Sequence, residues 1–182
     1  TEETILLETM SDDLDTYSLR LNEIINEAKL KTGKDKVFIV THSMGGLVAR
    51  KYLQIFGEED VEKLIMVGSP NHGIDGRILT GCSVLGTKKH CEDMDEESLF
   101  LNKLNYGKQP NIPVENIIGT GCDMQGENGD GLVKNSSAYL SWANNYYVNG
   151  TCEGFNFLHN NLAKPNKYPE VYDLIKKLIY LN

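Results

Sequence analysis

The most constraining feature of the chain is a strand, a tight turn, a helix and a second strand within residues 36–67. Residues 36–40 (KVFIV) are a continuous β-branched and aromatic run, typical of a strand buried on both faces of a parallel sheet. After the turn 41–46 (THSMGG), apolar residues recur at helical spacing as far as Gly57, and residues 64–67 (LIMV) form a second buried run. This order predicts a right-handed βαβ unit with its turn at the carboxyl edge of the sheet.

Further periodic segments continue the alternation of helix and strand on both sides of this unit. A chain of 182 residues is long enough for one substantial hydrophobic core and too short for two separate cores of that size. We therefore expect a single α/β domain over residues 1–182, with a mostly parallel sheet flanked by helices. The other expected elements are a helix capped by Ser11 or Asp12 and ended by Gly33, an amphipathic stretch over 97–105, strands over 114–118 and 146–148, and a last helix from Pro169.

The turn Thr41-His42-Ser43-Met44-Gly45 has the small-x-Ser-x-Gly spacing of a nucleophile elbow. Such a turn strains the serine backbone and needs small residues at 41 and 45, so that strand and helix can pack closely. It would aim Ser43 Oγ out of the sheet and direct the Met44 N–H at a developing oxyanion. A glycine-rich turn that only packs is the alternative, and the strand-turn-helix context favours the elbow.

Ser43 would need a general base, and four histidines compete for that role. His42 directly precedes the nucleophile, so we expect its side chain to point away from Oγ and to pack as a supporting residue. We expect His72 to brace its loop and His90, among charged residues, to be solvated. His159 follows the last strand in a loop that returns to the edge carrying Ser43, and the chain order serine, acid, histidine favours it.

An orienting carboxylate is expected from Asp130, which is flanked by two glycines in the loop after the third strand. Its position favours the role of triad acid over that of a turn aspartate, which is common in Gly-Asp-Gly sequences. Asp123 and Glu127 share the loop and are the alternatives.

Four cysteines, Cys82, Cys91, Cys122 and Cys152, fall in segments that have the composition of loops. Their even number indicates two disulfides, most simply Cys82 with Cys91 and Cys122 with Cys152, although three pairings are possible. Disulfides persist outside the cytoplasm, so we expect a secreted or cell-surface protein. Reduced thiols, or a metal site using Cys82, His90 and Cys91, are the alternatives; adjacent ligands have poor geometry for a tetrahedral site, and we expect no metal.

The charge balance and the apolar pattern exclude other classes of partner. Lys and Arg total 18 against 26 Asp and Glu, a net charge of −8, which argues against binding a nucleic-acid backbone. No apolar run approaches the roughly 20 residues that span a bilayer, so we expect no transmembrane segment.

Four segments resemble the α/β-hydrolase superfamily and, within it, the secreted lipase and esterase group, which is also similar to inositol deacylases. They run in family order over residues 37–50 (VFIVTHSMGGLVAR), 67–73 (VGSPNHG), 94–105 (MDEESLFLNKLN) and 117–133. The resemblance implies a serine carboxylester hydrolase that acts on a small-molecule or lipid ester through an acyl-serine intermediate and needs no cofactor. It also implies a lid or cap over residues 74–113.

By the same resemblance, Ser43 is the nucleophile, Asp130 the acid, His159 the base and Met44 a backbone oxyanion donor. Leu99, Phe100 and Leu104, with Leu101, could line an acyl-chain groove, yet the same stripe is equally typical of helix packing.

The chain departs from the family pattern in two places, at the elbow and before the first helix. Thr41 stands where the family usually has Gly, and only ten residues precede Ser11, where the family has further strands and a second oxyanion donor. Losing one such donor costs about 100- to 1000-fold in rate. We expect an exposed edge at the nucleophile strand unless an upstream segment or a partner covers it. A catalytically inactive, hydrolase-like binding domain of a larger protein is therefore the alternative function.

Overall fold

Four parallel strands form the central sheet of the computed structural model, which describes residues 13–74, 88–154 and 157–180. The parallel register between each neighbouring pair of strands confirms the expected mostly parallel α/β sheet. A two-stranded antiparallel ribbon follows the third strand. In spatial order, the sheet contains β1 (Val37–His42), β2 (Val61–Val67), β3 (Val114–Thr120) and β6 (Asn144–Asn149), and the ribbon contains β4 (Cys122–Asp123) and β5 (Asn128–Gly129).

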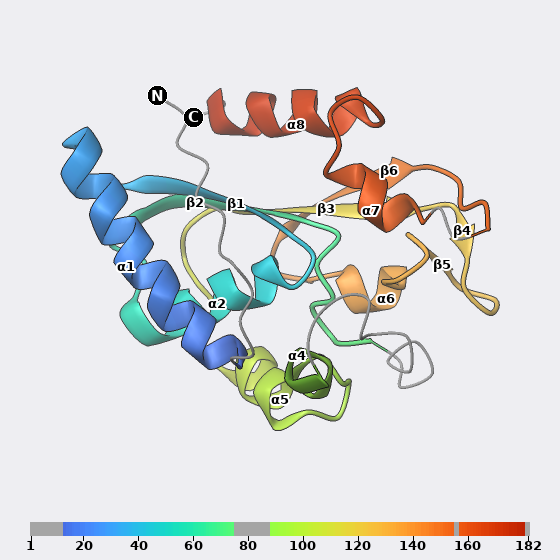
Figure 1. Cartoon of the computed structure of the whole chain (residues 1–182), viewed down its shortest axis with the longest axis horizontal. Helices are drawn as coiled ribbons and strands as arrows, with labels where there is room; N and C mark the ends of the chain where they lie inside the picture. Colours follow the sequence, from blue (N-terminus) through green and yellow to red (C-terminus); the bar gives the residue numbers. More distant parts are fainter. Residues whose placement is uncertain (1–12, 75–87, 155–156, 181–182) are drawn as a thin grey trace.

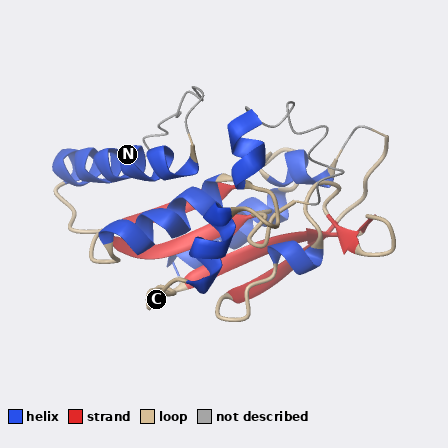
Figure 2. Ribbon diagram, turned by 90° about the horizontal axis from the view of Figure 1, so that it is seen from below, coloured by secondary structure: helices blue, strands red, loops and turns tan. Residues whose placement is uncertain are grey.

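Helices cover both faces of the sheet (Figure 1). Below it lie α1 (Leu14–Thr32) and α2 (Gly45–Phe56), and Figure 2 looks from this side, with helices in front of the strands. Above the sheet lies α8 (Pro169–Tyr180), which begins at the predicted proline. The remaining helices are α4 (Lys88–Asp93), α5 (Leu99–Tyr106), α6 (Asn135–Ala138) and α7 (Leu158–Leu162).

Side-chain caps and glycines set the helix ends. The carboxylate of Asp13 accepts a hydrogen bond from the Thr16 N–H at 2.8 Å, and Gly33 ends α1 in the left-handed region with φ 66°. The caps predicted for α1, Ser11 and Asp12, lie outside the described residues.

The edge position of β1 corrects one prediction and confirms another. Residues 36–40 were expected to be buried on both faces, but only Ile39 is buried, and Phe38 and Val40 are 43% and 46% exposed. The reason is topological, because β1 lies at one end of the strand order and has a strand neighbour on one side only in the described sheet. Among the described residues, no strand pairs with the outer edge of β1, as expected for the nucleophile strand.

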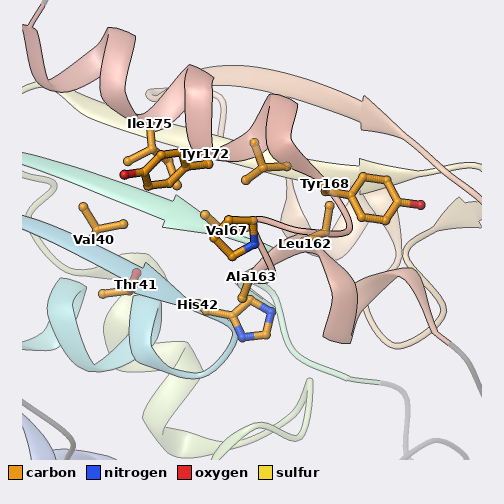
Figure 3. A pocket seen from close by; sticks show the side chains of 11 residues that line it. Val40, Thr41, His42, Val67, Leu162, Ala163, Tyr168, Tyr172 and Ile175 are labelled. Atoms are coloured by element: carbon orange, nitrogen blue, oxygen red, sulfur yellow. The ribbon is translucent and has the colours of Figure 1, made fainter. Parts of the chain in front are cut away.

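An apolar groove of about 620 Å³ runs between this edge and α8 (Figure 3). Val40 and His42 of β1 form one wall, and Tyr172 and Ile175 of α8 form the other. The groove exists because α8 packs over the middle of the sheet, where Val171 and Leu178 join the core formed by β2 and β3.

The segment predicted as a lid is packed into the core over its described part. Met94 and Leu101 contact the same cluster as Leu14 and Leu47. The buried guanidinium of Arg50, from α2, donates to Asn105 Oδ1 of α5 at 2.8 Å. Residues 75–87 lie outside the described residues, so a lid over 74–113 stays a prediction.

Candidate active site

The turn after β1 has the geometry of the predicted elbow. Ser43 has φ 55°, a left-handed conformation that is strained for a residue with a side chain, as expected. A Cβ on Gly45 would lie 3.3 Å from Thr41 Cβ, and one on Gly46 would lie 2.1 Å from Ser69 Oγ. Thr41 is accommodated in the place of the usual glycine because Gly45, opposite it, has no side chain.

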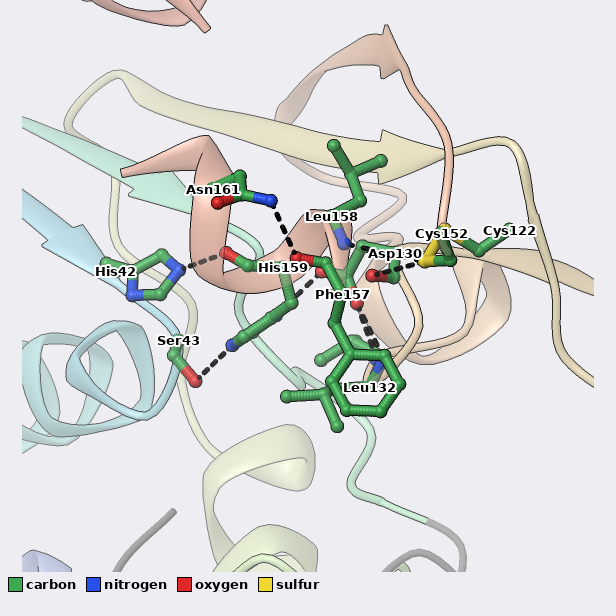
Figure 4. Close-up of polar contacts among 11 residues, drawn as sticks. His42, Ser43, Cys122, Asp130, Leu132, Cys152, Phe157, Leu158, His159 and Asn161 are labelled. Atoms are coloured by element: carbon green, nitrogen blue, oxygen red, sulfur yellow. Dashed lines mark hydrogen bonds and ion pairs between the residues drawn. A yellow bond between two sulfur atoms is a disulfide. The ribbon is translucent and has the colours of Figure 1, made fainter. Parts of the chain in front are cut away.

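The structure brings Ser43, His159 and Asp130 together, from three separate parts of the chain (Figure 4). His159 Nε2 lies 2.9 Å from Ser43 Oγ, and its Nδ1 lies 2.7 Å from Asp130 Oδ2. A carboxylate only accepts hydrogen bonds, so Nδ1 carries the proton and the Nε2 lone pair accepts from the serine hydroxyl. This is the tautomer that a general base requires.

Asp130 is 1% exposed, and backbone groups hold its carboxylate. Its Oδ1 accepts from the N–H groups of Leu132 at 3.0 Å and Val133 at 2.7 Å, which leaves Oδ2 for His159. The backbone N–H of His159 also donates to the Asp130 carbonyl at 2.9 Å. Acid and base are thus joined through both backbone and side chain.

Two glycines that the sequence pattern did not predict as part of the site make room for this pair. A Cβ on Gly68, just after β2, would lie 3.1 Å from Asp130 Oδ2 and 3.3 Å from His159 Nδ1. A Cβ on Gly119, in β3, would lie 2.7 Å from Asp130 Cβ. The available signal was a glycine at the carboxyl end of each of two buried strands, where the sheet edge approaches the site.

A disulfide joins Cys122 to Cys152 and ties the acid loop to the histidine loop, the second pairing expected. Cys152 Sγ accepts from the N–H of Leu158, the residue before His159, at 3.4 Å. Cys91 is also disulfide-bonded, which removes it as a metal ligand. Cys82 lies outside the described residues, so its pairing stays a prediction.

The other three histidines have different surroundings. His42 packs beside His159, with 4.7 Å between ring centroids, and burial lowers its pKa to about 4. His72 braces its loop as expected, since its Nδ1 lies 3.0 Å from the Ser137 carbonyl. His90, expected in solvent, is fully buried in α4 with its ring 5.3 Å from that of Tyr17, because α4 packs against α1.

The alternative acids make local contacts instead. Asp123 Oδ1 accepts from the Gly126 N–H at 2.9 Å within its own turn. Glu127 accepts from the Ser136 N–H at 2.8 Å, and hydrogen bonds from the Ser136 hydroxyl and from this N–H lower the pKa of the Glu127 carboxyl. Neither shares the contacts that His159 makes with Asp130.

The apolar stripe of α5 divides between core and solvent. Phe100 and Leu104 are buried in the core with Leu101, and Leu99 is 70% exposed. The three residues predicted for an acyl-chain groove therefore do not line one surface. Phe100 and Leu104 have the places of ordinary helix packing, the other interpretation of the stripe, and an acyl-chain groove at this helix stays a prediction.

Met44 lies between Ser43 and the first residue of α2. N–H groups in the first turn of a helix have no partner within that helix, and the helix dipole adds positive potential there. The N–H groups of Gly46 and Leu47 donate to the carbonyls of Ser43 and Met44, at 3.1 and 3.0 Å, so the role of oxyanion donor stays a prediction for the Met44 N–H.

Comparison with known proteins gives the name of this architecture. A family model described as the alpha/beta hydrolase fold matches residues 6–78, which include β1, the elbow, α2 and β2. Lipase BlEst2 of Bacillus licheniformis, in its mature form, superposes with a TM-score of 0.65 and 21% identity, over 88% of this chain and 75% of that chain. The chain has the α/β-hydrolase fold.

Other solved structures share the α/β-hydrolase fold with this chain. A thermophilic esterase matches with a TM-score of 0.61 and 16% identity, over 96% of this chain and 77% of that chain. Phospholipase PlaB from Legionella pneumophila, in complex with thio-NAD, matches with a TM-score of 0.59 and 19% identity, over 75% of this chain and 35% of that chain. The chain thus spans about a third of PlaB, and 41% of BlEst2 in its propeptide form. None of the curated proteins matches it.

At these identities the likeness concerns the fold, and the expected similarity to inositol deacylases stays a prediction. Within residues 13–74, 88–154 and 157–180, the structure has no helix that is long and apolar enough to cross a membrane.

Proposed function

We propose that this α/β-hydrolase domain is a serine carboxylester hydrolase, of the lipase or esterase class. The observation that carries the proposal is the hydrogen-bonded series from Asp130 through His159 to Ser43, with distances of 2.7 and 2.9 Å, on a strained elbow. Solved structures with this fold include a lipase, an esterase and a phospholipase, which supports the same class of reaction for this chain.

In the proposed reaction, Ser43 Oγ attacks the carbonyl carbon of the ester while His159 Nε2 takes the hydroxyl proton. Asp130 holds the imidazole in place and stabilises the imidazolium that forms. The Met44 N–H donates to the oxyanion, and His159 returns the proton to the leaving alcohol. Water, activated by His159, then releases the acid from the acyl-serine and restores the hydroxyl.

We propose small-molecule or lipid esters as substrates and a secreted or cell-surface location. The Cys122–Cys152 bridge supports the location, because disulfides persist in oxidising compartments. The site needs no cofactor for this chemistry, since the nucleophile and the base are side chains of the chain.

The test is steady-state hydrolysis of p-nitrophenyl esters of increasing acyl length by the purified chain. Ser43→Ala should lower kcat by at least about 1000-fold, as expected for loss of a nucleophile. Ser136→Ala, which changes an exposed serine, is the matched control and should leave kcat unchanged. Hydrolysis that survives in Ser43→Ala, or absence of hydrolysis by the unchanged chain, would refute the proposal and favour a non-catalytic binding domain.

A further inference from the structure

We propose that His42 is a positioning residue, which holds the imidazole of His159 against Ser43 through a hydrogen bond to the His159 backbone. The inference rests on the proposed function of the same site. His42 Nε2 lies 2.9 Å from the His159 carbonyl oxygen, and the two rings pack with 43° between their planes. In Figure 4, the His42 side chain points away from Ser43 Oγ and toward this carbonyl.

The chemistry of the acceptor fixes the state of His42. A carbonyl oxygen can only accept, so Nε2 carries the proton and the neutral ring has its lone pair at Nδ1. Burial in the wall of the groove beside α8 disfavours the charged ring, and the nearby His159 adds to this effect, so the pKa of His42 falls to about 4 (Figure 3). His42 is therefore a neutral donor at neutral pH.

The bond joins two parts of the site that come from different elements. His159 and Asp130 are already coupled through their backbones, and the Cys122–Cys152 bridge holds their loops together. Ser43 belongs to the other part, at the end of β1. Because His42 is the residue next to Ser43, its bond to the His159 carbonyl ties the base to the strand that carries the nucleophile.

The His159 carbonyl belongs to helix α7, and its oxygen has two lone pairs, so it can accept a hydrogen bond from outside the helix. The helix has only five residues, and the Ala163 N–H, four residues after His159, donates to Asn161 instead. His42, at the end of β1, is the donor that meets this carbonyl. A displacement of about 1 Å at a reacting group can cost about 100-fold in rate, so a single positioning bond can matter for catalysis.

The experiment compares two substitutions, which separate the effect of the hydrogen-bond donor of His42 from the effect of its aromatic ring. His42→Phe keeps an aromatic ring and removes the donor, and His42→Gln removes the ring and keeps an amide donor of similar reach. His72→Phe is the matched control, because His72 is exposed and makes the same kind of contact, at 3.0 Å, with the Ser137 carbonyl. Rates are measured per active site titrated with a fluorophosphonate, which removes the effect of unfolded protein.

We expect His42→Phe to lower kcat by about 10- to 100-fold with KM changed less than about threefold, since the His42 side chain points away from Ser43 Oγ and acts through His159. His42→Gln should stay within about fivefold of the unchanged protein, and His72→Phe within about twofold. The inference would be overturned if His42→Phe had the same kcat per titrated site as the unchanged protein. It would also be overturned if His42→Phe and His42→Gln lowered kcat by the same factor. If His42→Phe does not fold, His42→Leu serves as the second donor-free variant.

Histidine ¹⁵N NMR tests the same inference without catalysis. The His159 Nδ1–H resonance, protected by Asp130, should be observed in the unchanged protein and in His42→Gln, and should broaden or exchange rapidly in the donor-free variant. Absence of ester hydrolysis together with this NMR pattern would refute the proposed function and leave the positioning bond supported. An unchanged resonance in His42→Phe would overturn the inference.

Discussion

Asp130 keeps its place through hydrogen bonds to backbone N–H groups and to His159, and its carboxylate oxygens both have defined acceptor roles. An asparagine amide at this position would place its NH₂ group against one of these N–H groups, and neither group could accept a hydrogen bond from the other. Asp130→Asn should therefore misorient His159 and lower kcat by about 10⁴-fold, the scale known for triad acids. Asp123→Asn, an exposed aspartate of the same loop, should leave kcat within about twofold. Similar steady-state kinetics for the two variants would contradict the assigned role.

The lowered pKa of His42 makes a contribution to stability that depends on pH. The folded ring has a pKa of about 4 against 6.5 for the free side chain, so the unfolded state binds the proton first as the pH falls. This contribution is present above about pH 6.5 and is lost as the pH falls toward 4, with an upper limit of about 3 kcal/mol.

Chemical denaturation of the unchanged protein and of His42→Gln measures this effect. Between pH 7 and pH 4.5, the unchanged protein should lose about 2–3 kcal/mol more free energy of unfolding than the Gln variant, since glutamine does not titrate. If the difference in free energy of unfolding between the two proteins is the same at both pH values, His42 does not stay neutral in the folded protein.

At the scale of the elements, the end of β2 must carry a residue without a side chain. Gly68 has φ 59°, and a Cβ there would press on the Asp130–His159 hydrogen bond. Gly33 has nearly the same φ, 66°, with open space where its Cβ would lie. Alanine at either position should cost about 1 kcal/mol of stability for the left-handed backbone.

Only Gly68→Ala should also lower kcat, by about tenfold or more, because only there does the new methyl group meet the triad. Thermal unfolding and steady-state kinetics of both alanine variants make the comparison. Equal kcat values in Gly68→Ala and Gly33→Ala would mean that the close approach at Gly68 has no effect on the site.

The Cys122–Cys152 bridge connects the two loops that supply acid and base, across a sequence separation of 30 residues. Replacing both cysteines by alanine should lower the free energy of unfolding by ~3–4 kcal/mol on the chain-entropy account. It should also lower kcat, since the N–H of Leu158 loses its sulfur acceptor beside His159. Denaturation and kinetics of the double variant test both effects, and an unchanged kcat would limit the bridge to a stabilising role.

At the scale of the molecule, the sequence predicted what depends on local patterns. Residues 36–67 gave the βαβ unit because two apolar runs, a short turn and a helical repeat leave few topologies. Ser43, Asp130 and His159 could be chosen by chain order and element type. The ribbon β4–β5 and the short helices α4, α6 and α7 were missed, because elements of two to six residues have too few positions to show a period.

The wrong predictions concern burial, which depends on tertiary neighbours. His90 has charged sequence neighbours and yet is buried, because α4 turns it toward α1. Phe38 and Val40 belong to an apolar run and are half exposed, because β1 is an edge strand in the described sheet. Gly68 was overlooked because its role is a contact across three separate segments of the chain.

The central claim, that Ser43 is activated by His159 and Asp130, is tested most directly by fluorophosphonate labelling of the purified chain. Intact-mass and peptide mass spectrometry would show whether label attaches and to which residue. The account predicts one label per chain, attached to Ser43, absent in Ser43→Ala and strongly slowed in Asp130→Asn. No labelling of the unchanged protein, or labelling that persists in Ser43→Ala, would contradict it.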